Sequence, residues 1–518
     1  MHDKIGKNVM DNRISRKSKA KRNIFFGYLN KLVLTVLEFI SRACFIKILG
    51  ENLLGVNGVF ANVIQLLSLA ELGMNNVVSY SFYKPLAEND ENKISLLIKF
   101  YKKIYNIIAL IVLVIGLALF PFIEKITNTD IQISHINIIY LFFLADTVFS
   151  YLFVYKTILL NADQKGYINS SYTIVSNTVR IVLQIIALIV FRNIYIYLGI
   201  KVIVNVLCNF LLSKKTEKEF PYIKNNSVMF FIQKEEKNAL GKVIKSGFVY
   251  KLSALLLNST DNILISVILG TVWVGYISNY DTIYAGLGSF YIILFSSLTP
   301  SIGNLVETES AEKKFDVFSF MSFVSSWLGI VFSVCFFVLS KEFVMLWIGK
   351  KFILDTSTVF CKSLIVFISC SMQPVFSFRE ALGLYRKTKY VMLLAACLNI
   401  GLSVWLGYKF GLKGILYATV ISTVATYYWY EPYLLYRNYF YQKFFLYLAK
   451  KGYDFICLLA LIFVSSIVFD RWRVSSFALW ICKSASVFCF ASAICMISYA
   501  FFPKSKFYIK NMLGRRCF

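Results

Sequence analysis

Histidine is almost absent from this chain of 518 residues, since His2 and His135 are the only two. With so few imidazole groups, we expect neither a histidine-dependent metal site nor a histidine general acid or base. The eleven cysteines show no CxxC spacing and lie mostly inside apolar runs, where cysteine serves as a small hydrophobic residue. The composition therefore predicts no bound metal and no cofactor.

Motifs and domains that other functions require are missing as well. No GxxxxGK[ST] loop occurs, so no nucleotide drives this chain directly. No serine, histidine and carboxylate set is present, and no long external loop offers room for the active site of a membrane polymerase. No long polar interval separates the apolar runs, which excludes a sizeable soluble domain. We therefore expect a protein that is not an enzyme.

Apolar sequence dominates instead, with a hydrophobic fraction of 58% and a mean hydropathy of +0.64. Apolar runs of about 20 residues recur, each long enough to cross a hydrocarbon layer of about 30 Å. The pattern predicts an all-α integral membrane protein with about fourteen transmembrane helices. The predicted spans are 24–49, 53–79, 101–123, 136–161, 167–190, 194–213, 243–269, 274–300, 318–340, 358–384, 388–408, 412–437, 453–470 and 477–502.

Basic residues are concentrated in alternate loops. The net charge is +27, and lysine and arginine are dense in the tail 1–22, the linker 214–242 and the tail 503–518. The intervening loops 124–135 and 270–273 carry few or none. Because positive loops stay in the cytoplasm, both termini should be cytoplasmic. This distribution accounts for the charge without nucleic-acid binding.

An internal repeat joins the first and seventh predicted spans. Residues 27–55 and 247–275 align without a gap and are identical at eight of twenty-nine positions, including Gly50 aligned with Gly270. Both spans run outward, so the halves are parallel repeats, a common transporter plan. The predicted parts are a cytoplasmic tail 1–22, a six-helix half 23–213, a linker 214–242, a second half 243–437, two extra helices 453–502 and a tail 503–518.

Charged residues lie inside several spans, where each costs about 2.5–3.5 kcal/mol on insertion scales. In span one, Lys31, Glu38 and Arg42 share a helical stripe, and Glu38 precedes Arg42 by four, the order that favours an ion pair. Span seven repeats the pattern with Lys251 and Asp261. We interpret these stripes as walls of a polar, water-filled cavity.

Further intramembrane charges occur in spans four, five and eight. Since basic groups outnumber acidic ones, the cavity should attract an anion such as a phosphate. The predicted substrate-binding cations are Lys31, Arg42, Arg180 and Lys251. The predicted coupling or ion-pair residues are Glu38, Asp261, Asp281 and Asp146. The alternative is that these charges pair with one another, or reach the interface when they lie near a helix end.

Glycine and proline mark points where the spans turn or bend. Gly50 and Gly270 lie at the turns that follow spans one and seven. Pro300 and Pro374 should end or bend spans eight and ten. Each is equally consistent with a hinge and with a static turn.

Several short motifs near the N-terminus point to a family. Arg42 is followed by Leu49-Gly50-Glu51 and Leu54-Gly55. The segments LLSLAELG at 66–73, SFYKPLAE at 81–88 and FYKKIY at 100–105 continue the pattern. Residues 23–121 thereby resemble the polysaccharide flippases of the multidrug, oligosaccharidyl-lipid and polysaccharide exporter superfamily, which serve O-antigen and capsule synthesis. The remaining chain agrees mainly in hydropathy, span count and two-by-six arrangement.

The resemblance implies a fold, a substrate and a place. The fold would be a V-shaped pair of six-helix bundles around a cationic cavity, with two extra C-terminal helices. The substrate would be an undecaprenyl-diphosphate-linked oligosaccharide, flipped from the inner to the outer leaflet of the bacterial cytoplasmic membrane. Membrane lipids, a polysaccharide polymerase and a chain-length regulator would be partners, no nucleic acid would bind, and the chain would act as a monomer.

Three other functions remain open. A multidrug or cation antiporter of the same superfamily would favour a cavity dominated by carboxylates. A lipid II flippase would be a close relative. A membrane glycan polymerase would be an enzyme, and it would need a longer external loop than 124–135 or 341–357 provides.

Overall fold

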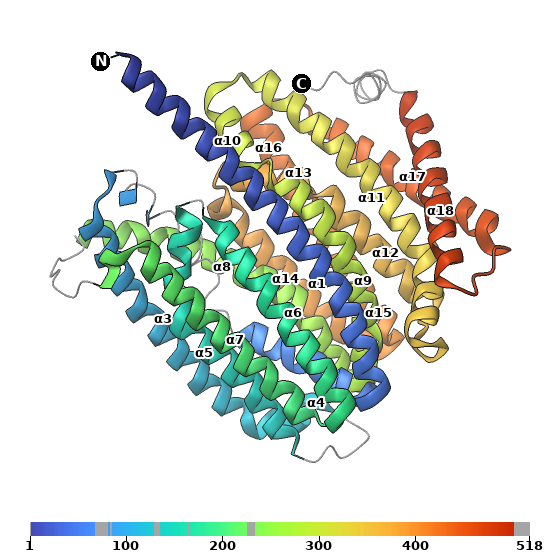
Figure 1. The fold of residues 1–518 in the computed structure, drawn as a ribbon. Coiled ribbons are helices and arrows are strands. Elements are labelled where there is room, and N and C mark those ends of the chain that lie inside the picture. The colour runs from blue at the N-terminus through green and yellow to red at the C-terminus, as the bar shows by residue number, and fades with distance from the viewer. Residues whose placement is uncertain are drawn as a thin grey trace. The chain divides into compact units, whose positions relative to one another are not determined.

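The computed structural model describes residues 2–67, 81–82, 85–86, 88–128, 135–163, 165–224 and 234–501. It describes side chains for 33–67, 81–82, 85–86, 88–128, 135–163, 165–223 and 249–501, apart from 251, 258, 300 and 307. Throughout these ranges the regular structure is helical (Figure 1), which confirms the predicted all-α fold. The chain forms two compact units, Met1–Leu252 and Ser253–Phe518.

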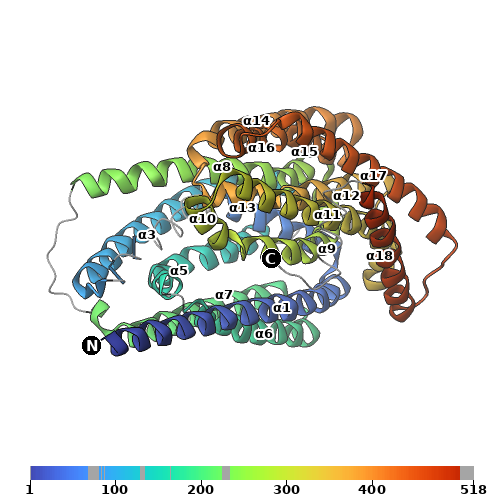
Figure 2. The same cartoon turned by 90° about the horizontal axis from the view of Figure 1, so that it is seen from above.

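The first unit is built from long helices that pack along their sides. Figure 2 shows α1 running beside α6, with α7 against both α5 and α6. Its elements are α1 (His2–Leu67), α3 (Glu91–Leu119), η2 (Phe120–Phe122), α4 (Ile123–Thr127), α5 (Ile136–Ala162), α6 (Gly166–Phe191), α7 (Ile194–Glu219) and η3 (Pro221–Lys224). Helix α8 (Lys234–Leu269) enters the second unit at Ser253.

The second unit contains the remaining helices and several breaks between them. These elements are α9 (Thr271–Ser296), α10 (Thr299–Thr308), α11 (Ala311–Ile348), η4 (Lys350–Phe352), α12 (Thr356–Ser371), α13 (Gln373–Ala381), α14 (Tyr385–Phe410), α15 (Leu412–Ala425), α16 (Tyr427–Leu435), the π-helical turn η5 (Tyr436–Phe440), α17 (Phe444–Asp470) and α18 (Phe477–Ala500).

Eleven helices in the described part of the chain are long and apolar enough to cross a membrane. The remaining predicted spans are 24–49, 53–79 and 412–437. Helix α1 covers the first of these and part of the second, whose residues 68–79 lie outside the described ranges. The third is divided at Thr426 into α15 and α16, because Thr426 has non-helical backbone angles of −122° and −102°.

Side-chain caps fix where several helices begin. The first turn of a helix leaves backbone N–H groups without partners, and a polar residue just before it can accept their hydrogen bonds. Asp90, Ser310, Asp355 and Ser476 each accept from the N–H three residues later, and Asn193 accepts from the two N–H groups that follow Ile194. The starts of α3, α11, α12, α18 and α7 are therefore encoded locally.

The predicted turns and bends occur at the glycines and prolines. Gly50 has φ 84° and ψ 174°, and Gly270 has φ 97° and ψ 155°. These similar conformations lie in a region that favours glycine, and they reverse the chain at equivalent places in the repeat. Proline lies in the first turn of α10 and of α13, directly after α9 and α12 end. Proline at that position lacks an N–H that would be unsatisfied in any case.

Helices α14 and α15 form a tight hairpin in which glycine permits a close approach. Gly411 makes the turn with φ 65°. A Cβ atom at Gly414 would lie 2.1 Å from the carbonyl oxygen of Leu406, which is backbone and cannot move aside. The hairpin geometry therefore requires glycine at position 414.

Gly414→Ala should lower the melting temperature of the detergent-solubilised protein, because overpacking of this kind costs about 1–3 kcal/mol. Gly401→Ala is the matched control, since Gly401 lies inside α14 with open space where its Cβ would be. Alanine there should be neutral or stabilising by up to about 1 kcal/mol. Equal melting temperatures for the two variants, measured by thermal unfolding, would show that the hairpin tolerates the methyl group.

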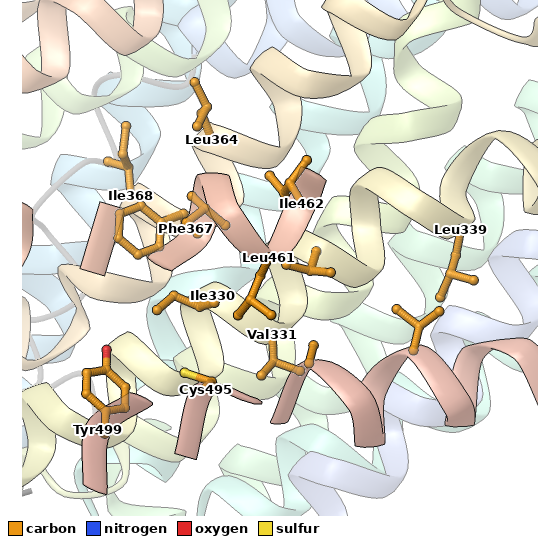
Figure 3. Close-up of a cluster of buried hydrophobic side chains, with 14 of the residues drawn as sticks. Ile330, Val331, Leu339, Leu364, Phe367, Ile368, Leu461, Ile462, Cys495 and Tyr499 are labelled. Carbon is orange, nitrogen blue, oxygen red and sulfur yellow. The ribbon is translucent and has the colours of Figure 1, made fainter. Parts of the chain in front are cut away.

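The last two helices, α17 and α18, pack against α11 and α12. Figure 3 shows Ile330, Val331 and Leu339 of α11 facing side chains of the other three helices. Leu364, Phe367 and Ile368 come from α12, Leu461 and Ile462 from α17, and Cys495 and Tyr499 from α18. The predicted extra helices are thus integral to the second unit.

Buried polar contacts fasten these helices at two levels of α11. At one level, Asp454 of α17 is fully buried and accepts hydrogen bonds from Ser326 at 2.5 Å and from Tyr499 at 2.6 Å. At the other level, Lys483 of α18 donates to Glu342 at 2.7 Å and to the carbonyl oxygen of Trp472 at 2.8 Å. At each level, a charged group that would be costly to bury alone gains polar partners from another helix.

Candidate functional site

Two of the predicted substrate-binding arginines act electrostatically on one tyrosine in the first unit. Arg42 comes from α1 and Arg180 from α6, and both interact electrostatically with the hydroxyl of Tyr197 on α7. That hydroxyl also hydrogen-bonds the side chain of Ser41, and the Tyr197 ring meets Phe45 edge-on at 5.2 Å. Charges from two helices, α1 and α6, therefore act on a single phenol of a third helix, α7.

Arg180 has hydrogen-bonding capacity left over. Its Nη2 donates to Asn177 Oδ1 at 3.0 Å, whereas its Nε is buried without a hydrogen-bond partner in the described part of the chain. One turn further on, Gln184 donates to the carbonyl oxygen of Tyr197 at 2.9 Å, and its own Oε1 has no described partner. A guanidinium with a free donor can bind an oxyanion through a charge-assisted hydrogen bond.

Asp146 of α5 lies in a separate network of the first unit. Lys201 of α7 places its Nζ 3.2 Å from one Asp146 oxygen, and Asn205 donates to the other at 2.9 Å. The Lys201 ammonium also lies 4.4 Å from the centre of the Phe143 ring. Both oxygens of Asp146 are satisfied, so this carboxylate has the environment of a structural ion pair.

Asp261 has a different environment in the second unit. The Thr419 hydroxyl of α15 donates to Asp261 Oδ2 at 2.6 Å, and Asn399 of α14 donates to that hydroxyl at 3.0 Å. Asp261 Oδ1 and Asn399 Oδ1 are both buried without described hydrogen-bond partners. The carboxylate could bind a proton. Together, a carboxylate, an amide oxygen and a hydroxyl could also ligate a hard cation such as Na⁺.

A lysine lies between the two aspartates of the second unit. Lys362 of α12 forms an ion pair with Asp281 of α9, and its ammonium interacts electrostatically with Asp261. It also lies 6.0 Å from the centre of the Tyr284 ring. Asp281 is thereby neutralised within the unit, whereas Asp261 retains an oxygen without a donor.

A small cavity adjoins the Asp261 network. Its volume is about 70 Å³, and Tyr284, Ser369, Thr419, Thr423 and Tyr427 supply its polar lining. Thr419 therefore contacts both the cavity and Asp261. Tyr284 donates to Ser369 at 3.0 Å, so part of the polar wall is already internally bonded.

The other predicted residues are placed less fully. Lys31 and Lys251 lie on α1 and α8, but their side chains fall outside the described residues. Glu38 lies on α1, and its side chain is exposed. The expected ion pair between Glu38 and Arg42 stays a prediction.

Sequence reasoning missed the partners of these charges. Lys201 and Lys362 each interrupt an apolar run. Arg180 was selected because it is a charged residue inside a predicted span, and the same criterion would have selected these two lysines. Asn205, Asn399 and Thr419 give no comparable signal, because uncharged polar residues are frequent in these helices. Their roles depend on contacts between helices far apart in the sequence.

Comparisons with known proteins place the fold. No family model and no curated protein matches the sequence. Among solved structures, the lipid II flippase MurJ in an inward closed conformation is similar, with a TM-score of 0.65, 14% identity, and coverage of 91% of this chain and 98% of that one.

Two MATE transporters have similar folds. An outward-facing MATE family transporter of the MOP superfamily gives a TM-score of 0.57 at 12% identity, covering 79% of this chain and 93% of that one. A MATE transporter mutant from Vibrio cholerae gives 0.53 at 12% identity, covering 83% and 100%. The chain therefore has the fold of the MOP-superfamily membrane transporters, as the sequence predicted.

Proposed function

We propose that this chain is a flippase for undecaprenyl-diphosphate-linked oligosaccharide repeat units, which it moves from the inner to the outer leaflet by alternating access. The observation that carries the proposal is the pair of guanidinium groups at Tyr197, Arg42 and Arg180. Two fixed cations in one membrane-embedded site suit a diphosphate, which presents several oxyanions close together. The fold shared with a lipid II flippase supports a lipid-linked substrate.

The physical task explains why such a site is needed. A sugar and diphosphate headgroup cannot cross hydrocarbon bare, because its polar groups would lose their hydrogen bonds. Fixed guanidinium groups replace the hydration of the phosphates, while the lipid tail stays in the bilayer. An inside-negative potential favours outward movement of an anion by about 2.3 kcal/mol per charge per 100 mV. Lys31 and Lys251 would add two further cations, one from each repeat.

Asp261 is the best candidate for the coupling group. It combines burial with a carboxylate oxygen that has no hydrogen-bond partner among the residues the structure describes, and the same holds for the amide oxygen of Asn399. Asp146 and Asp281 are each matched by a lysine, and they are better assigned as ion-pair residues. A proton or a sodium ion bound at Asp261 would therefore drive the return step.

The cellular setting follows from the substrate and the loop charges. The protein would lie in the bacterial cytoplasmic membrane with both termini in the cytoplasm, and it would act as a monomer. A polysaccharide polymerase and a chain-length regulator would consume its product during capsule or O-antigen synthesis. A membrane glycan polymerase is the less favoured function for this chain, since the proposed site holds cations and a coupling carboxylate rather than a catalytic set.

One reconstitution tests the proposal against its two nearest rivals. Proteoliposomes containing the purified chain would be supplied with an undecaprenyl-diphosphate oligosaccharide, with lipid II, or with a lipophilic organic cation. We expect translocation of the oligosaccharide lipid at least tenfold faster than of the others, because the proposed site offers two guanidinium groups to a diphosphate. Faster movement of lipid II would favour the peptidoglycan function. Export of the organic cation alone, reported by its fluorescence, would favour the antiporter.

A further inference from the structure

Helix α3 carries a cationic patch that the proposed transport does not use. The patch consists of Lys99, Lys102 and Lys103, with Asn106 one turn further along. A cavity of about 410 Å³ lies over these residues and continues over Ile107 and Leu110. The spacing of three, four and seven residues places all of these side chains on one face of the helix.

The same face becomes strongly apolar in the next turns of α3. Leu110 is 60% exposed and Val114 is 58% exposed, whereas Tyr105 and Val112 on the opposite face are fully buried in the bundle. The cationic face is therefore the face that turns toward lipid. A cation on this face meets the surrounding bilayer instead of the protein interior.

The depth of the patch matches the membrane interface. At 1.5 Å per residue, the 19 residues from Lys103 to Phe122, the next strongly exposed aromatic, rise by about 28 Å. That length is close to a hydrocarbon thickness of about 30 Å. The lysines consequently lie at one edge of the apolar layer, where lipid phosphates are located and where long side chains can extend toward them.

These lysines differ from the other basic residues at the ends of the unit's helices. Lys156 pairs with Glu217 at 2.6 Å, and Lys215 pairs with Glu219 at 2.8 Å. None of the three lysines of the patch forms an ion pair with a carboxylate in the described part of the chain. Their charge is therefore available to an external anion.

We propose that Lys99, Lys102 and Lys103 form a binding site for the phosphate of an anionic phospholipid such as phosphatidylglycerol. The glycerol backbone and acyl chains would follow Ile107, Leu110 and Val114 along the apolar face. Ammonium groups suit this ligand as point charges that tolerate a mobile phosphate. Clustered lysines beside a membrane span are a readable signature of anionic-lipid attraction.

The test measures lipid retained by the intact, detergent-solubilised protein with native mass spectrometry. The parent protein would be titrated with phosphatidylglycerol and with phosphatidylcholine of identical acyl chains. We expect at least tenfold preference for phosphatidylglycerol, which the triple variant K99Q/K102Q/K103Q should lose. The triple arginine variant K99R/K102R/K103R keeps the charge and should keep the preference.

A second triple variant controls for net charge. K350Q/K409Q/K413Q removes the same number of exposed lysines elsewhere and should retain the preference. Because Lys102 and Lys103 are exposed, the double variant K102Q/K103Q provides a milder change if the triple variant unfolds early. Equal phosphatidylglycerol retention by the parent and the glutamine variants would overturn the proposal. Displacement by undecaprenyl phosphate but not by phosphatidylglycerol would overturn it too, and would assign the patch to the carrier lipid.

Discussion

Replacing Arg180 or Arg42 by alanine should reduce flipping of the lipid-linked oligosaccharide by roughly 10- to 100-fold, while the protein still inserts into the membrane. The charges of both guanidinium groups act on Tyr197, and each group would make charge-assisted hydrogen bonds to the diphosphate. The loss of a hydrogen bond to a charged group costs about 1.5–3 kcal/mol, which corresponds to roughly 10- to 100-fold. Lysine at either position should restore part of the rate, because a charge remains but the bidentate fork is lost.

Lys47 provides the matched control for these variants. It lies on α1 a little beyond one turn from Arg42, is also basic, and has an exposed side chain. Lys47→Ala should flip the substrate at close to the parent rate. The measurement is the appearance of the oligosaccharide on the far side of proteoliposomes, normalised to the amount of inserted protein. Parent-like rates for both arginine variants would remove them from the substrate site.

Asp261→Asn should abolish the stimulation of flipping by an ion gradient and leave the gradient-independent rate within a few-fold of the parent. The substitution keeps the shape of the side chain and its contact with Thr419, but it removes the negative charge that would hold the coupling cation. Sodium and proton gradients would be imposed separately across proteoliposomes, so that the ion that loses its effect is identified. A gradient response equal to that of the parent would exclude Asp261 from coupling.

Asp281→Asn is the informative comparison. Asp281 lies in the same unit and interacts with the same lysine, yet its carboxylate is already engaged in an ion pair. Replacing it leaves Lys362 without its ion-pair partner. The melting temperature of the protein should therefore fall, while the stimulation of flipping by the ion gradient should stay close to that of the parent. Asp261→Asn should change the gradient response, whereas Asp281→Asn should change the melting temperature. A general loss of folding would not produce this difference between the two variants.

Much of the fold follows from the sequence because its signals are local. Apolar length predicts the spans, and the prolines at the starts of α10 and α13 predict the breaks after α9 and α12. The glycines at 50 and 270 predict two turns of similar conformation. The break at Thr426 escaped prediction because threonine has no strong breaking tendency, and Pro432 lies inside the helix that follows.

The site is predictable only in part, because a charge in a span signals importance without naming its partner. Arg42 and Arg180 were selected by charge, and they come together through Tyr197, which no local rule selects. Asp146 and Asp281 carry the same local signal as Asp261. They differ from Asp261 because each forms an ion pair with a lysine from another helix, Asp146 with Lys201 and Asp281 with Lys362. Such pairing depends on tertiary packing, so one sequence leaves it open.

The two polar contacts on α11, of Ser326 with Asp454 and of Glu342 with Lys483, bear on how a membrane protein can gain helices. Lipid tails are as apolar as the aliphatic and aromatic face that α17 and α18 cover, so burying that face provides little drive for association in a bilayer. Asp454 and Lys483, acting through Ser326 and Glu342, instead determine where along α11 the added helices attach. These contact points lie 16 residues apart on α11, about 24 Å along a helix axis. An appended helix pair can therefore be positioned along its neighbour by two polar contact points.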